Sequence, residues 1–182
     1  MNLPAGLRWP ILTIDFEASS LEDDGYPVEV GMARWRTTAS PIEVWSSTLR
    51  PHRDWLSRGR SDKSSAAVHG ITRSEIDAGM TALRAVRMLD WIADEAPAFC
   101  DGGVHDAYWM TRLAKAAGRS CSFPLADWDA MMCSLPAEAQ QKAERWLGRH
   151  PVPHRAGPDA ERLLRALAAG LGSSPGSAPI LP

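Results

Sequence analysis

Two carboxylates at the end of an apolar run constrain the fold of this chain more than any other feature. Residues 11–14 have the β-branched and apolar character of a buried strand, and Asp15 and Glu17 follow them directly. Side chains two residues apart on a strand point to the same face, so these two acids lie side by side and repel each other. The sequence therefore predicts a strand whose end carries a divalent cation, and the remaining ligands must come from elsewhere in the chain.

Length and composition favour one globular domain. A chain of 182 residues can bury one core, and 45% hydrophobic with 23% charged residues is typical of soluble proteins. No apolar run approaches the roughly 20 residues that cross a bilayer. The chain's start lacks the residue order of a signal peptide, and its three cysteines form no Cys-x-x-Cys pair. That usage favours reduced thiols, so we expect a cytoplasmic protein.

The net charge of −2 argues against a protein that coats nucleic acid non-specifically. It does not exclude a protein that grips a short strand, because carboxylates that hold a metal ion no longer repel phosphate. The charge therefore leaves nucleic acid open as a partner.

Hydrophobic patterning predicts a sheet followed by helices. Strands are expected at residues 10–17, 27–35 and 42–49. The short polar connections between them favour antiparallel pairing. Residues 50–65 are expected to form a surface loop, residues 1–170 the domain, and residues 171–182 a flexible tail. Strands first, then helices alternating with a short strand, indicate an α/β fold with a mixed sheet covered by helices.

Further acids and a histidine mark two later junctions of the chain. Asp106 follows the segment FCDGGVH at a predicted strand-to-helix junction, where Asp101 is its rival. His154 and Asp159 lie in HRAGPDAERLL, and Asp159 begins a helix with an apolar stripe. Each aspartate alone is typical of a helix N-terminus, and a lone histidine is most often a surface residue. Together with the first two acids, however, they form an ordered set.

That set resembles the DEDDh family of 3′→5′ exonucleases over about residues 10–170. Asp15 and Glu17 match the family's first motif, and Asp106 matches its second. His154 and Asp159 match the third motif, and the segment VHGIT matches a segment that recurs between the first two motifs. The resemblance implies a ribonuclease H-like fold, with a mixed five-stranded sheet flanked by helices.

The resemblance also implies a mechanism and a set of catalytic residues. Two Mg²⁺ or Mn²⁺ ions would be held by the four carboxylates, since hard cations take oxygen ligands. These ligands would be Asp15, Glu17, Asp106 and Asp159. His154 would take the proton from the attacking water, a task that suits a group titrating near neutral pH.

The resemblance further implies the substrate, namely the 3′ end of single-stranded DNA or RNA, with release of nucleoside monophosphates. Leu21 falls where the family keeps a leucine beneath the terminal base, and His69 is a candidate for lining the same pocket. Arg155 either holds a phosphate or is a solvated loop residue.

Two other functions compete with this interpretation. One is a nucleic-acid-binding module that keeps the fold without turnover. The other is a phosphodiesterase confined to short oligonucleotides. The sequence also leaves open the choice between DNA and RNA, because no residue is an obvious reader of the 2′-hydroxyl. A homodimer is compatible with the sequence.

Overall fold

A mixed six-stranded sheet lies at the centre of the computed structural model, which describes residues 7–58 and 61–180. The strand order is β5-β4-β1-β2-β3-β6. The strands are β1 (Ile11–Ala18), β2 (Pro27–Trp35), β3 (Ile42–Thr48), β4 (Ala98–Cys100), β5 (Leu125–Asp127) and β6 (Ser177–Pro179). Strands β1, β2 and β3 pair antiparallel, while β4 and β5 continue the sheet parallel to β1 and β6 lies parallel to β3.

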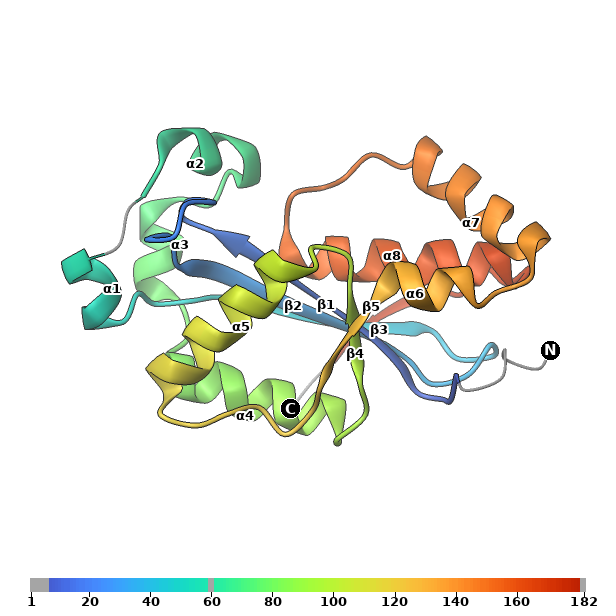
Figure 1. The fold of residues 1–182 in the computed structure, drawn as a ribbon, viewed down its shortest axis with the longest axis horizontal. Coiled ribbons are helices and arrows are strands. Elements are labelled where there is room, and N and C mark those ends of the chain that lie inside the picture. Colours follow the sequence, from blue (N-terminus) through green and yellow to red (C-terminus); the bar gives the residue numbers. More distant parts are fainter. Residues whose placement is uncertain (1–6, 59–60, 181–182) are drawn as a thin grey trace.

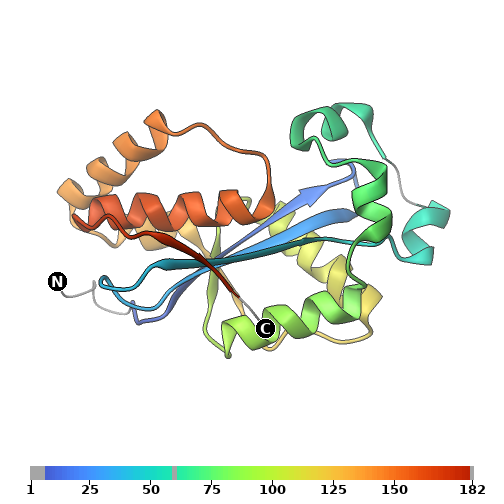
Figure 2. The same cartoon turned by 180° about the vertical axis from the view of Figure 1, so that it is seen from behind.

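Helices cover both faces of this sheet (Figures 1 and 2). They are α1 (Arg53–Arg58), α2 (Lys63–His69), α3 (Arg73–Ala78), α4 (Ala82–Ala93), α5 (Val104–Ala117), α6 (Trp128–Cys133), α7 (Ala137–Arg149) and α8 (Ala156–Gly170). Helices α4 and α5 pack on one face and α8 on the other, with α7 against α8. The predicted α/β fold with a mixed sheet flanked by helices is confirmed. Among the described residues, no helix is long and apolar enough to span a bilayer.

The alternation of β1 decides which face carries the acids. Leu12, Ile14 and Phe16 belong to the core under α4 and α5. Thr13, on the other face, donates a hydrogen bond to the carbonyl of Ala160 in α8, at 2.6 Å. Because side chains alternate along a strand, Asp15 and Glu17 share the α8 face with Thr13.

The sheet has six strands rather than the expected five because the chain's end returns to it. Within the tail expected to be flexible, β6 pairs with β3, and the Ile180 N–H donates to the carbonyl of Val44 at 2.9 Å. Ile180 is also buried against the core. Pairing and burial together offset the entropy of ordering this segment, which contains two glycines and two prolines between residues 170 and 180.

The expected loop at residues 50–65 contains helix α1 and the start of α2 instead. Each helix buries one residue, Trp55 in α1 and His69 in α2, so neither displays an apolar period in the sequence. The HGIT segment forms the turn that follows. Gly70 ends α2 at φ 66°, and Thr72 begins α3 with a capping box to Glu75. Figure 1 shows α1, α2 and α3 grouped beyond the end of β1.

Candidate metal and active site

Carboxylates from three parts of the chain meet beside the end of β1. Asp15, Glu17 and Asp159 each place an oxygen within 4.8 Å of the others, and so do Asp15, Asp101 and Asp106. Asp15 belongs to both groups. The structure therefore brings together all four carboxylates named from the sequence, and it adds Asp101, which the sequence treated as a rival of Asp106.

Asp106 lies in the first turn of α5, close to the end of β4, and is 3% exposed. Its Oδ2 accepts a hydrogen bond from the Gly102 N–H at 3.0 Å. A Cβ atom on Gly102 would lie 2.6 Å from that oxygen, so only glycine permits this approach. Burial, with a smaller effect from the charge of Asp101, raises the pKa of Asp106 to about 7.

Asp159 lies in the first turn of α8 with its two oxygens in different situations. Oδ2 accepts a hydrogen bond from the Arg155 N–H at 2.9 Å, which helps to cap the helix. Oδ1 is buried, and no described residue donates a hydrogen bond to it. A buried carboxylate oxygen without a donor is costly unless a cation meets it.

The pKa values of Asp15 and Glu17 are raised as well, which is typical of carboxylates that crowd together in a buried place. Burial, followed by the charges of Asp106 and Glu17, raises the pKa of Asp15 well above its usual range. Burial, followed by the charges of Asp159 and Glu29, raises the pKa of Glu17 to about 7. Among the described residues, none of the four candidate ligands forms an ion pair with lysine or arginine. An all-oxygen set of this kind fits Mg²⁺ or Mn²⁺.

His154 lies on the connection between α7 and α8, two residues before Ala156, the first residue of the helix that carries Asp159. Its side chain is exposed and has no hydrogen-bond partner among the described residues. Its backbone adopts φ 57°, in the left-handed region that a residue with a side chain seldom occupies. Strain of this kind persists where the surrounding structure holds it in place.

The structure shows what holds this segment, a residue that the sequence analysis did not identify. Glu29 lies on β2 with its side chain 2% exposed. Its two oxygens accept hydrogen bonds from Arg155 Nε and Nη2 at 3.0 and 2.8 Å. Glu29 Oε2 also accepts from the Ala156 N–H at 2.9 Å. The one signal in the sequence is an acid in the middle of the otherwise apolar run PVEVGM.

The predicted substrate contacts occupy different environments. Leu21, in the β1–β2 connection, is 71% exposed and free to meet a ligand. His69 is buried at the end of α2, and its Nδ1 accepts a hydrogen bond from the Ile71 N–H at 3.0 Å, which leaves the proton on Nε2. Burial also lowers the pKa of His69. Arg155 donates hydrogen bonds to Glu29 through Nε and Nη2, and its Nη1 has no hydrogen-bond partner among the described residues.

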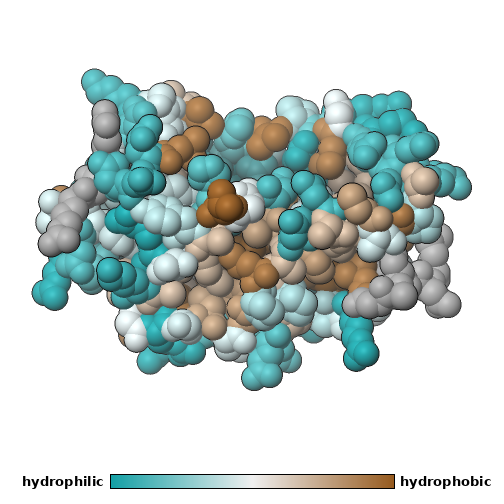
Figure 3. Space-filling view, in the orientation of Figure 1, coloured by the Kyte–Doolittle hydropathy of each residue, from teal (hydrophilic) through white to brown (hydrophobic). Residues whose placement is uncertain are grey.

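Other exposed apolar side chains accompany Leu21. Val68, at the end of α2, is 55% exposed, and Val104, at the start of α5, is 81% exposed. Figure 3 shows apolar patches of this kind scattered among hydrophilic side chains, rather than one continuous apolar surface. Single exposed apolar residues need no explanation by themselves.

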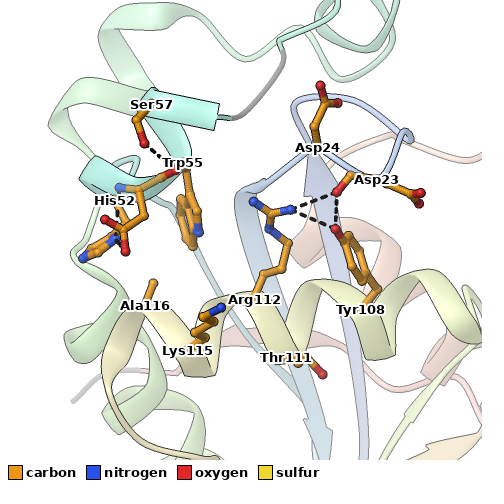
Figure 4. Close-up of a pocket in the computed structure, with 11 residues that line it drawn as sticks. Asp23, Asp24, His52, Trp55, Ser57, Tyr108, Thr111, Arg112, Lys115 and Ala116 are labelled. Atoms are coloured by element: carbon orange, nitrogen blue, oxygen red, sulfur yellow. Dashed lines mark hydrogen bonds and ion pairs between the residues drawn. The ribbon is translucent and has the colours of Figure 1, made fainter.

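A hollow of about 670 Å³ lies between α1, α5 and the β1–β2 connection. Arg112 reaches across it and donates through Nη1 to the Asp23 carbonyl and to the Tyr108 hydroxyl, at 3.0 and 2.8 Å (Figure 4). The side chains of Asp23 and Lys115 also line this hollow. None of the candidate metal ligands does, so the hollow is separate from the carboxylate site.

Comparisons with known proteins give a likeness in structure alone. No protein-family model matches the chain, and no curated protein sequence matches it. Solved exonuclease structures do match. One, described as 3′-end specific recognition of a histone mRNA stem-loop by 3′-exonuclease, aligns with a TM-score of 0.69 at 14% identity. The alignment covers 95% of this chain and 68% of that one.

Two further structures extend this likeness. E. coli exonuclease I in complex with a dA16 oligonucleotide aligns with a TM-score of 0.64 at 14% identity, over 88% of this chain and 41% of that chain. Cell-death related nuclease 4 aligns with a TM-score of 0.55 at 16% identity, over 90% of this chain and 64% of that chain. The chain thus spans less than half the length of exonuclease I. It has the fold of these exonuclease structures, as the resemblance in sequence predicted.

Proposed function

We propose that this protein is a metal-dependent 3′→5′ exonuclease that hydrolyses single-stranded DNA or RNA and releases nucleoside monophosphates. The observation that carries the proposal is that two clusters of three acidic side chains meet at Asp15, which belongs to both. The buried Asp159 Oδ1, which lacks a hydrogen-bond donor among the described residues, supports a cation at this place.

Asp15, Glu17, Asp106 and Asp159 would hold two Mg²⁺ or Mn²⁺ ions. Asp101 is a further candidate ligand, since its carboxylate belongs to the group of Asp15 and Asp106. When bound, two such ions supply positive charge for the attacking and leaving oxygens of a phosphodiester. The four carboxylates would hold these ions in place, and the ions would supply the positive charge that a scissile phosphate needs.

His154 is proposed as the general base that takes the proton from the attacking water. Its imidazole is exposed beside the start of the helix that carries Asp159, where it can meet a water bound at the carboxylate cluster. Leu21 is proposed to lie under the terminal base and His69 to line its pocket. The free Nη1 of Arg155 can donate to a phosphate.

The structural neighbours support nucleic acid as the substrate class without choosing its sugar. One was solved with a DNA oligonucleotide, and another recognises an RNA stem-loop. The three free thiols support the expected cytoplasmic location. The homodimer stays a prediction without support from these comparisons.

Cleavage of labelled oligonucleotides tests the proposal. Single-stranded DNA and RNA ladders, labelled at the 5′ or the 3′ end, are incubated with Mg²⁺, Mn²⁺ or EDTA. We expect stepwise shortening from the 3′ end in either metal and none in EDTA. Asp15→Ala should abolish cleavage, because Asp15 belongs to both carboxylate groups. Glu144→Ala, at an exposed acid of α7, should leave cleavage unchanged.

The same assay separates the competing functions. Binding of the ladder without cleavage would favour the non-catalytic module, and cleavage confined to dinucleotides would favour the small phosphodiesterase. Cleavage that persists in EDTA or in Asp15→Ala would contradict the metal site.

A further inference from the structure

Glu29 is a buried carboxylate beside the metal site that takes no part in it. In the β1–β2 register it lies directly opposite Glu17. Both of its oxygens are engaged by Arg155 and by the backbone of Ala156, so neither is free to bind a metal ion. It is also absent from both groups of carboxylates that converge on Asp15.

The burial of Glu29 is not explained by stability alone. Its side chain is 2% exposed whereas that of Arg155 is 38% exposed, and desolvating a carboxylate costs about as much as its attraction to such a partner returns. Glu29 also stands directly opposite a second acid, Glu17, in the β1–β2 register. A buried carboxylate beside another carboxylate calls for a role other than stability.

The partners of Glu29 indicate that role. Arg155 follows His154 directly and occupies the N-cap position of α8, where its own side chain makes no capping bond. Glu29 provides the cap from another strand by accepting the Ala156 N–H. Two residues along β2, a Cβ atom on Gly31 would lie 2.2 Å from the nitrogen of Gly157. The start of α8 therefore packs directly on the backbone of β2. This close packing lets the side chain of Glu29 bond to the Ala156 N–H.

We propose that Glu29 is a positioning residue for the reaction. Through the two bonds to the Arg155 guanidinium and the third to Ala156, it fixes the backbone on the C-terminal side of His154. It thereby holds the imidazole at a set distance from the carboxylates of β1. This inference rests on the proposed function, in which His154 is the base, and it concerns the placement of that base.

Single-turnover cleavage at saturating Mn²⁺ tests the role. Glu29→Gln should lower the rate by about 10–10²-fold, since a displacement of about 1 Å in a catalytic group can cost this much. The concentration of oligonucleotide that gives half the maximal rate should change by less than about threefold, because Glu29 itself is no substrate contact and Arg155 is kept. A residue that bound substrate would shift that concentration instead.

A double-mutant cycle with His154→Ala identifies the route of the effect. If Glu29 acts through His154, Glu29→Gln should cost less than about threefold in the His154→Ala background, because coupled residues are not additive. If Glu29→Gln acted by disturbing the fold in general, its fold-loss in rate would be the same in the His154→Ala background as in the wild type. Glu43→Gln is the matched control. It breaks the Arg34–Glu43 ion pair of the same sheet, which has no hydrogen bond to α8, and should leave the rate within about twofold.

Arg155→Lys is a second variant that keeps the positive charge beside Glu29 if Glu29→Gln fails to fold. Lysine cannot reproduce the two-pronged contact to Glu29, so the maximal rate should fall. The half-saturating concentration reports separately on the phosphate contact proposed for Arg155 Nη1. An unchanged maximal rate in Arg155→Lys, with or without an increase in the half-saturating concentration, would overturn the inference.

The remaining outcomes are distinct. Wild-type rates in Glu29→Gln, or equal losses in both backgrounds, would overturn this inference and leave the proposed function intact. A wild-type protein that cleaves no oligonucleotide would overturn both.

Discussion

His154 shows how a single residue can be strained, exposed and still fixed in place. Its φ of 57° costs on the order of 1 kcal/mol or more for a residue with a Cβ atom. The chain on its C-terminal side is bound by Glu29, so the strain cannot relax by moving the start of α8. Its imidazole has no partner among the described residues and is available for proton transfer.

Replacing each histidine of this loop tests whether His154 is the base. His154→Ala should lower turnover by about 10²–10⁴-fold while metal and single-stranded substrate still bind, because no proposed ligand is removed. The acidic limb of the pH–rate profile, measured at saturating metal, should flatten in this variant.

His150→Ala is the control for this experiment. His150 stacks on Trp146 with ring centroids 3.8 Å apart, and its Nδ1 lies 2.7 Å from the Trp146 carbonyl. Its loss should lower the melting temperature and leave turnover nearly unchanged. Equal and mild effects of both substitutions would make His154 an ordinary loop residue.

Sequence alone identified those candidate site residues whose order along the chain resembles the motifs of a known family. Asp15 and Glu17 were visible because acids are unusual at the end of an apolar strand. Glu29 was not identified, because its meaning depends on Arg155, a residue 126 positions away in the chain. Asp101 and Asp106 could be ranked from sequence, but only the fold shows that both carboxylates approach Asp15.

At the scale of elements, local patterns predicted the long strands and failed for short segments. The strand at 27–35 has the predicted bounds because a mainly apolar segment stands there between two polar, turn-forming connections. Helices α1 and α2 were missed because six or seven residues with one buried side chain carry no period. Strand β6 exists through its pairing with β3, which no local pattern encodes.

The junction between β4 and α5 provides a test at this scale. Gly102→Ala would place a methyl group 2.6 Å from Asp106 Oδ2, so the buried carboxylate must rotate away. We expect turnover to fall by about 10–10²-fold and Mn²⁺ affinity to weaken. The loss in unfolding free energy should be small, about 1 kcal/mol, because the displaced atoms belong to a side chain.

Gly148→Ala is the matched control, because a Cβ atom there meets nothing within 4 Å. This change within α7 should stabilise the helix by about 0.5–1 kcal/mol and leave turnover unaltered. Normal activity and metal affinity in Gly102→Ala would show that the close approach to Asp106 is not required.

At the scale of the whole molecule, the fold concentrates negative charge that sequence order keeps far apart. Acids from β1, the start of α5 and the start of α8 meet at one end of the sheet. The pKa of Glu17 rises from 4.5 to about 7, and that of Asp106 from 3.8 to about 7, mainly through burial. In the protein without metal, burial and, to a smaller extent, mutual repulsion therefore disfavour the ionised carboxylates, and bound cations would offset this cost.

The raised pKa values of Glu17 and Asp106 predict an unusual dependence of stability on pH. Both groups have a higher pKa in the folded than in the unfolded chain, so between about pH 4 and pH 7 the folded state holds protons that the unfolded chain has released. Without metal, stability should fall as the pH rises through this window and level off above about pH 7. Melting temperatures in EDTA should accordingly be lower at about pH 8 than at about pH 5. At about pH 8, saturating Mg²⁺ or Mn²⁺ should raise them again, since ions bind the ionised folded state.

Asp106→Asn connects this behaviour to the site. Asparagine keeps an oxygen that can accept from the Gly102 N–H but cannot ionise, so the decline with pH should become shallower. In EDTA at about pH 8 this variant should melt at a higher temperature than the wild type, and added metal should stabilise it less. Glu144→Gln, which removes an exposed charge from α7, should follow the wild-type curve. Coincident curves for the wild type and Asp106→Asn, or a wild-type melting temperature that rises with pH in EDTA, would mean that these carboxylates are not crowded in solution.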